Sequence, residues 1–175
     1  MLYSIPGVGF VMGVVEAGNL TKEAISEMKP QNTIAIGADH GGFEQKEVLK
    51  KWLKSNGYYI IDCGTDDYEP SVDYPDFAQV VAEKIVTGEA TRGILICGTG
   101  LGISIAANKV AGIRAVPVTS VEFARLSREH NNANVLCLSG RYVDEDTNKE
   151  IVRTFLNTEF EGGRHQGRLD KIEEV

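Results

Sequence analysis

From Thr33 onward, short apolar runs alternate with segments whose apolar residues recur at helical spacing, and this alternation most constrains the fold. The apolar runs predict five strands, over residues 33–38, 58–62, 93–97, 113–118 and 135–138. Helical patterns separate them and continue after the last one, where Asp144 opens one helix and Arg164 begins a final one. Strands separated by helices imply parallel pairing and right-handed crossovers. The sequence therefore predicts a three-layer α/β/α, Rossmann-like domain with a five-stranded parallel sheet, whose strand order stays open.

The bulk composition narrows the class of protein. A chain of 175 residues is long enough for one domain with a substantial core. Its formal net charge of −7 argues against general binding of nucleic acid or of an anionic membrane. Cys63, Cys97 and Cys137, each expected at the end of a strand, are too few for a disulfide framework or a zinc site. We therefore expect a protein of the reducing cytoplasm.

The N-terminal segment needs a separate interpretation. The apolar stretch from Ile5 to Val15 is shorter than the roughly 20 residues of a membrane-spanning helix, and no basic segment precedes it. We expect residues 1–27 to be an extension ahead of a catalytic domain over residues 28–175, with Met28 as an alternative start.

The segment from Gly93 to Ser104 carries the strongest functional signal. A buried strand ends at Cys97, and glycines follow at alternate positions, Gly98, Gly100 and Gly102. Ligands of open α/β sheets bind outside the carboxyl ends of the strands. Glycine lets the backbone N–H groups approach a ligand closely, so a thiol beside them suits proton abstraction next to an oxyanion. A P-loop and a dinucleotide fingerprint do not fit, because Ile103 stands where a glycine or lysine is needed. We expect a small anionic or carbonyl ligand here; the alternative is a structural cysteine in an ordinary turn.

Other polar groups are expected at the same edge of the sheet. The five strands end in Asp39-His40, Cys63-Gly64, Cys97-Gly98-Thr99, Thr119-Ser120 and Ser139-Gly140-Arg141. We place His130, which precedes the fifth strand, near these loops as well. Arg164 and Arg168 are four residues apart and would share a helix face, where two guanidinium groups can hold a phosphate. Solvated helix charge is the alternative, because acidic residues follow.

These segments together resemble one enzyme family. The motifs that carry the resemblance are Gly37–Phe43, Asp73-Tyr74-Pro75, Ile94–Lys109, Gly112–Ala115, His130-Asn131 and Glu161–His165. In this order they resemble ribose-5-phosphate isomerase type B, a family that also includes the subunits of galactose-6-phosphate isomerase and allose-6-phosphate isomerase. The resemblance extends from about residue 32 to the C-terminus.

The resemblance implies an aldose–ketose isomerase that needs neither metal nor cofactor and interconverts ribose 5-phosphate and ribulose 5-phosphate through an enediolate. It implies Cys97 as the catalytic base, because a second branch of the family carries a glutamate where this chain has Leu101. Thr99 would assist proton transfer and His130 would open the furanose ring. The substrate-binding set would be Asp39, Asn131 and Tyr74 for the sugar, Gly98, Gly100 and Gly102 for the enediolate oxygen, and His40, Arg141, Arg164 and Arg168 for the phosphate.

The same resemblance implies a homodimer with active sites shared between subunits, or a tetramer built from such dimers. Two other functions stay open. The site could isomerise a six-carbon sugar phosphate, such as allose 6-phosphate or galactose 6-phosphate. A domain of this class could also be a flavodoxin-like nucleotide-binding module without enzymatic activity.

Overall fold

The computed structural model describes residues 32–67 and 71–174. The expected extension over residues 1–27 lies outside this part of the chain. The strands are β1 (Thr33–Ala38), β2 (Tyr59–Asp62), β3 (Arg92–Cys97), β4 (Ala115–Pro117) and β5 (Val135–Ser139). The helices are α2 (Phe43–Ser55), α3 (Tyr74–Val86), α4 (Leu101–Ala107), α5 (Val121–Asn131), α6 (Glu145–Asn157) and α7 (Gln166–Glu173), and a 3₁₀ turn, η1 (Gly163–His165), directly precedes α7.

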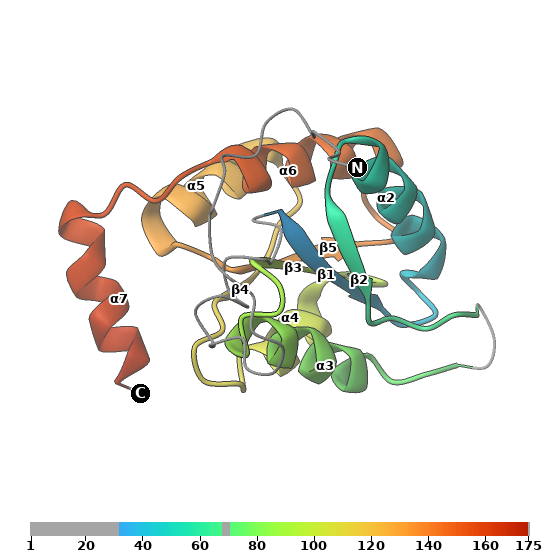
Figure 1. The fold of residues 1–175 in the computed structure, drawn as a ribbon, viewed down its shortest axis with the longest axis horizontal. Coiled ribbons are helices and arrows are strands. Elements are labelled where there is room, and N and C mark those ends of the chain that lie inside the picture. Colours follow the sequence, from blue (N-terminus) through green and yellow to red (C-terminus); the bar gives the residue numbers. More distant parts are fainter. Residues whose placement is uncertain (1–31, 68–70, 175) are drawn as a thin grey trace, which may run out of the picture.

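The five strands form one parallel sheet in the order β2-β1-β3-β5-β4. Helices α2, α5 and α6 cover one face, and α3 and α4 cover the other (Figure 1). The predicted three-layer α/β/α domain with a five-stranded parallel sheet is thus confirmed. Because β1, β3 and β5 are neighbours in the middle of the sheet, the loops that follow them meet at its carboxyl edge.

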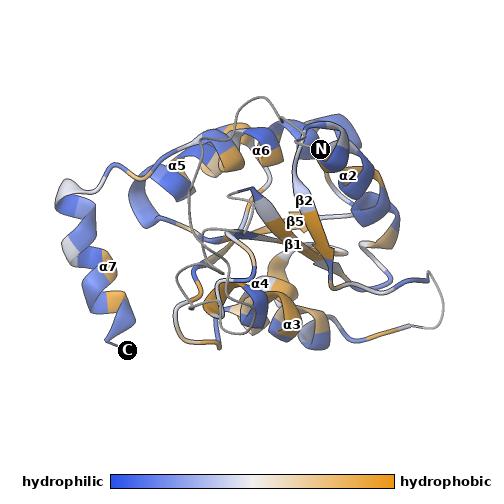
Figure 2. Cartoon of the chain, viewed as in Figure 1, coloured by the Kyte–Doolittle hydropathy of each residue, from blue (hydrophilic) through white to orange (hydrophobic). Residues whose placement is uncertain are grey.

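Alternate residues of the strands supply two cores, one on each face. Ile34, Ile36, Ile94 and Ile96 pack with α2, α5 and α6, and Phe155 is buried among them. Leu95, Cys97, Val135 and Cys137 pack with α3 and α4. Figure 2 shows the apolar strands between helices whose outer sides are hydrophilic. Successive residues of a strand point to opposite faces of the sheet, so the Cys97 side chain points to the face that α3 and α4 cover.

Side chains and glycine set the ends of the helices as the sequence indicates. The Ser120 Oγ accepts a hydrogen bond from Phe123 N at 3.2 Å, and the Asp144 Oδ1 accepts one from Thr147 N at 2.9 Å. Each side chain satisfies a backbone donor in the first turn of its helix. Helix α2 ends before Gly57, whose φ of +84° is one that glycine adopts without strain.

Two local expectations were wrong. Strand β4 spans Ala115–Pro117, shorter than residues 113–118, and pairs only with β5. Arg164 lies in the turn η1 rather than in the last helix. Helix α4 begins at Leu101 because the left-handed Gly100 serves as its N-cap.

Helix α7 stands apart from the sheet and its two helical layers (Figure 1). The ion pair between Arg114 Nη1 and Glu173 Oε1, at 2.5 Å, ties it to the segment before β4. Among the helices of the described residues, none has both the length and the apolar character needed to cross a membrane.

Candidate active site

The loops after β1, β3 and β5 are joined by backbone hydrogen bonds at the carboxyl edge. Gly140 N donates to Cys97 O at 2.8 Å, Arg141 N donates to Gly98 O at 3.3 Å, and Asp39 N donates to Ile96 O at 3.3 Å. The Ser139 hydroxyl adds a bond to Gly98 O at 2.8 Å. Ser139 was not predicted as a site residue, although its place at a strand end is visible in the sequence. These contacts hold the three loops in one arrangement.

Two glycines allow these loops to touch backbone to backbone. A Cβ atom at Gly42 would lie 2.5 Å from Ile96 O, and one at Gly140 would lie 2.5 Å from Gly41 O. Real Cβ atoms do not approach an oxygen so closely, so any other residue would push the loops apart. Neither glycine was predicted as a site residue. The available signals were the place of Gly140 directly after β5 and the Gly41-Gly42 pair in the loop after β1.

Cys97 is the cysteine whose thiol faces backbone donors. It is 5% exposed, and its Sγ accepts a hydrogen bond from Gly100 N at 3.1 Å. Gly100 has a φ of +79°, which lets the chain fold back so that this N–H points at the sulfur. A backbone N–H thus lies directly beside the thiol, and donors placed in this way can stabilise an oxyanion that forms next to it.

The other two cysteines have different surroundings. Cys137 was expected at a strand end but lies in the middle of β5, where burial and the neighbouring Cys97 raise the pKa of its thiol. Burial also raises the pKa of Cys63, whose thiol donates toward Ile61 O at 3.7 Å. Both thiols therefore stay protonated at neutral pH, and Cys97 is the candidate base.

Thr99 and Tyr74 lie beside the same loop. The exposed Thr99 accepts a hydrogen bond at Oγ1 from Leu101 N, at 3.3 Å. The Tyr74 ring covers Gly102, where an added Cβ would come within 2.7 Å of Tyr74 Cζ. The loop of Gly98, Gly100 and Gly102 is thus flanked by a hydroxyl and a phenol.

His40 and Arg141 line a small hollow at this edge. The hollow has a volume of about 100 Å³, and Gly41, Glu44, Gln45 and Gly140 complete its wall. The Arg141 side chain crosses the loop so closely that its Cδ would lie 3.5 Å from a Cβ at Gly98. The His40 Nδ1 lies 3.3 Å from Val72 O, which fixes its ring. An imidazole and a guanidinium in a hollow of this size suit a small anion.

Asp39 is buried beside these groups. Its Oδ1 accepts a hydrogen bond from Gly42 N at 3.1 Å. Burial raises the pKa of the Asp39 carboxyl above its usual value of 3.8, although His40, the N–H groups of Gly41 and Gly42, and Arg141 act in the opposite direction. The fold thus disfavours the charged form of the Asp39 carboxyl, and hydrogen bonds from a polar substrate can stabilise that form.

We predict that Asp39→Asn stabilises the fold near neutral pH. With a raised pKa in the folded state, the wild-type chain loses stability as the pH rises from 3.8 through that pKa, because the folded state must give up a proton it holds more tightly than the unfolded chain. Asparagine avoids this loss. In thermal unfolding, the Tm advantage of Asp39→Asn should grow between pH values below 3.8 and neutral pH. The exposed Asp66→Asn is the control, and an Asp39→Asn advantage that shrinks with rising pH would contradict the prediction.

A second group of predicted site residues lies at the opposite edge of the sheet. His130 and Asn131 end helix α5, which leads into the start of β5, whereas Cys97 pairs with Ser139 at its end. At about 3.3 Å per residue, the five residues of β5 separate the two edges by about 13 Å. The expectation that His130 lies near the loops that follow the strands was therefore wrong for a single chain.

The second group also contains the C-terminal arginines. Arg164 lies in η1 and Arg168 in α7, both exposed. The acidic residues of α7 bond elsewhere: Glu173 to Arg114, and Asp170 to Gln166 at 2.7 Å. Within residues 32–67 and 71–174, Arg168 has no carboxylate partner, and Arg164 bonds only His165. These two cations are available to an anionic ligand.

The ring of His165 stacks on that of His130, with centroids 4.3 Å apart and planes 10° from parallel. Ligand-type atoms of these rings and of Glu161 lie within 4.8 Å of one another. In-plane lone pairs of parallel rings do not converge on one ion, and the Nε of Arg164 lies 3.4 Å from His165 Nε2. The geometry therefore suits a stacked imidazole pair rather than a metal centre.

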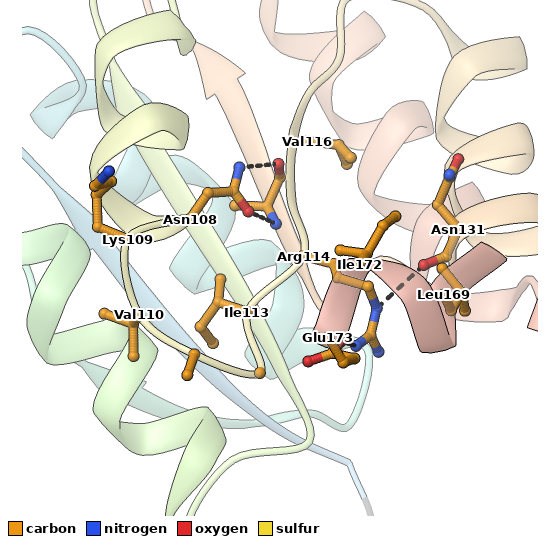
Figure 3. A pocket seen from close by; sticks show the side chains of 13 residues that line it. Asn108, Lys109, Val110, Ile113, Arg114, Val116, Asn131, Leu169, Ile172 and Glu173 are labelled. Atoms are coloured by element: carbon orange, nitrogen blue, oxygen red, sulfur yellow. Dashed lines mark hydrogen bonds and ion pairs between the residues drawn. The ribbon is translucent and has the colours of Figure 1, made fainter. Parts of the chain in front are cut away.

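A groove of about 800 Å³ runs between α7 and residues 108–116, next to Asn131 (Figure 3). Leu169 and Ile172 of α7 face it from one side, and Val110 and Ile113 from the other. This groove could not be predicted from the sequence, because it depends on where α7 stands relative to the sheet.

Comparison with known proteins places the chain among sugar isomerases. Residues 34–172 match the family model of ribose/galactose isomerases. Ribose-5-phosphate isomerase B of Escherichia coli (strain K12) is 49% identical over 139 residues, 79% of this chain and 93% of that protein. The structure of ribose-5-phosphate isomerase B from Clostridium thermocellum is 56% identical, with a TM-score of 0.80 over 81% of this chain and 95% of that one. That of the Mycoplasma genitalium enzyme with bound ribulose-5-phosphate is 47% identical, with a TM-score of 0.78 over 81% and 94%.

A parallel sheet that presents a thiol and backbone donors at its carboxyl edge, in a chain this similar to sugar isomerases, defines an aldose–ketose isomerase. The chain belongs to the ribose/galactose isomerase family.

Proposed function

We propose that this enzyme interconverts ribose 5-phosphate and ribulose 5-phosphate, with Cys97 as the base. The observation that carries the proposal is the hydrogen bond from Gly100 N to Cys97 Sγ, at 3.1 Å in a nearly buried site. The similarity to ribose-5-phosphate isomerase B proteins over most of both chains supports the substrate.

The proposed reaction moves one proton between adjacent carbons. The Cys97 thiolate takes the proton from C2 of the open-chain aldose, and the C1 carbonyl oxygen becomes the enediolate oxygen. The N–H groups of the loop of Gly98, Gly100 and Gly102 stabilise that oxygen. The proton returns to C1, while Thr99 assists the transfer of the hydroxyl proton from O2 to O1. Asp39, Asn131 and Tyr74 contact the sugar.

Ring opening and phosphate binding are assigned to the remaining residues. His130 opens the furanose ring, since an imidazole can both donate and accept a proton near neutral pH. His40, Arg141, Arg164 and Arg168 bind the phosphate, whose binding energy positions the reacting carbons. The absence of a carboxylate partner for Arg168 among the described residues supports this assignment.

We also propose a homodimer in which each site takes one group of residues from each chain. The placement of Cys97 and His130 at opposite edges of one sheet supports it. So do the groove beside Asn131 and the apolar side chains that α4 exposes, Leu101 at 58% and Ile105 at 68%. A tetramer would add a second contact between such dimers.

The isomerase domain is proposed to span residues 28–175, which include the match to the family model from residue 34. A thiol base must stay reduced, and Cys63, Cys97 and Cys137 are all free thiols. We therefore propose a reducing compartment, the cytoplasm, as the place where the enzyme works.

The substrate is tested by assaying the dialysed protein with a panel of aldose phosphates, and comparing the rate per active site. We expect ribose 5-phosphate to give the highest kcat/KM. A higher value for allose 6-phosphate or galactose 6-phosphate would replace the five-carbon substrate while keeping the same chemistry. No turnover of any sugar phosphate would overturn the proposal.

We predict that Arg168→Ala raises the KM for ribose 5-phosphate. Losing a charge-assisted hydrogen bond costs about 1.5–3 kcal/mol, which corresponds to roughly a 10- to 150-fold weaker interaction. Steady-state kinetics would measure it, with Lys171→Ala on the same helix as the control. An unchanged KM in the folded Arg168→Ala protein would show that this arginine does not bind the phosphate.

A further inference from the structure

We propose that His165 is a positioning residue that holds the His130 imidazole in the orientation needed to open the sugar ring. The inference rests on the proposed ring-opening role of His130 and adds a residue to which no role has been assigned. The stacked rings, 4.3 Å between centroids, carry it.

His165 is itself held firmly. It is only 4% exposed, and its backbone N donates to Gly162 O at 3.0 Å within the turn η1. The segment before this turn is held against α5 by a backbone hydrogen bond from Glu161 N to Glu129 O, at 3.1 Å. His130 sits half-buried in the last turn of α5, next to this anchor. The buried ring of His165 therefore supports one face of the more exposed His130 ring.

Burial and the neighbouring cations favour the neutral form of His165. Its Nε2 accepts a hydrogen bond from Arg164 Nε at 3.4 Å, and Glu161 Oε2 lies 3.7 Å away. Burial, followed by His130, Arg164 and Arg168, lowers the pKa of His165, and Glu161 acts in the opposite direction. At neutral pH the ring that stacks on His130 is therefore uncharged.

The orientation of His130 matters for opening and closing the sugar ring, and not for the proton transfer at Cys97. Ribose 5-phosphate closes its ring through O4 onto C1, so the aldose must be opened before proton abstraction. Ribulose 5-phosphate carries phosphate on O5 and cannot close a five-membered ring onto C2, so it is already open. Exchange of its C1 protons with solvent uses the open chain alone, so a residue that positions His130 should affect net isomerisation of ribose 5-phosphate far more than this exchange.

The test compares His165→Ala, which removes the stacked ring, with His165→Phe, which keeps a planar ring but has no ring nitrogen. Gln166→Ala, in the next position, is the control. For each protein kcat/KM is measured for the isomerisation of ribose 5-phosphate, and exchange of the C1 protons of ribulose 5-phosphate is measured in deuterated water. The ring-proton NMR shifts of His130 report the stack. His130→Asn gives the pattern that loss of ring opening produces.

We expect His165→Ala to lower kcat/KM for ribose 5-phosphate by about 10- to 100-fold, the scale of a misplaced catalytic group, and to change the C1 exchange of ribulose 5-phosphate by less than about threefold. His165→Phe should recover most of the isomerase activity and keep the upfield shift of His130 that the Ala variant loses. Equal losses of isomerisation and of C1 exchange, or no recovery in a folded Phe variant whose His130 shift is retained, would overturn the positioning role.

The same data separate this inference from the proposed function. If His130→Asn itself loses isomerisation and C1 exchange equally, ring opening is not the role of His130, and the proposed function is wrong at that step. If His130→Asn loses isomerisation alone and His165→Ala does not, only the positioning role fails.

Discussion

Replacing Cys97 by alanine should lower turnover of ribose 5-phosphate by about 100- to 10,000-fold, the usual cost of losing a general base. Substrate binding should persist, because the phosphate and hydroxyl contacts lie on other residues. The sulfur accepts its hydrogen bond from Gly100 N, and alanine leaves the glycine loop in place. The loss should therefore appear in kcat, with a much smaller change in KM.

Exchange of the C2 hydrogen with deuterated water measures the same step directly. We expect Cys97→Ala to abolish both exchange and net isomerisation. Cys63→Ala is the matched control, since its thiol faces a carbonyl oxygen and should be dispensable. Near-normal exchange in the Cys97→Ala protein would rule out this thiol as the base.

Two inactive variants should restore each other when mixed. Cys97→Ala removes the thiol at the carboxyl edge of the sheet, and His130→Asn removes the imidazole at the opposite edge. After random exchange of subunits, half of the dimers contain one intact composite site out of two, so about a quarter of the wild-type activity on ribose 5-phosphate should return. Recovery of this size from two nearly inactive proteins is a large and specific signal.

The control mixture combines two variants that each lack a residue at the carboxyl edge of the sheet. Cys97→Ala mixed with Asp39→Ala should recover nothing, because every composite site then lacks one of the two residues. Recovery in this control, or none in the first mixture after exchange is verified by native mass spectrometry, would contradict the division of the site between chains.

Much of the fold could be predicted because it follows from local pattern. Apolar runs at 33–38 and 93–97 read as buried strands, and Ser120 and Asp144 mark helix starts through bonds made within one turn. Strand order could not be predicted, since it depends on which helical face packs on which side of the sheet. The groove beside α7 was missed for the same reason.

The site was predicted in part. Cys97 ends β3 and Asp39 directly follows the neighbouring β1, so their common edge follows from parallel topology alone. The position of His130 also follows from topology, because a residue before a strand lies at the edge opposite to that of a residue after one. The stacking of His165 on His130 could not be foreseen, because it depends on how the turn at Gly162 and Gly163 folds against α5.

The separation of Cys97 from His130 has a consequence for the enzyme in dilute solution. A single chain holds both residues but places them at opposite edges of one sheet, so under the shared-site proposal an isolated chain has no complete site at all. Below the dissociation constant of the dimer, the rate would then scale with the square of the enzyme concentration rather than linearly. Association of subunits thereby becomes an on-switch for catalysis, set by how much protein the cell makes.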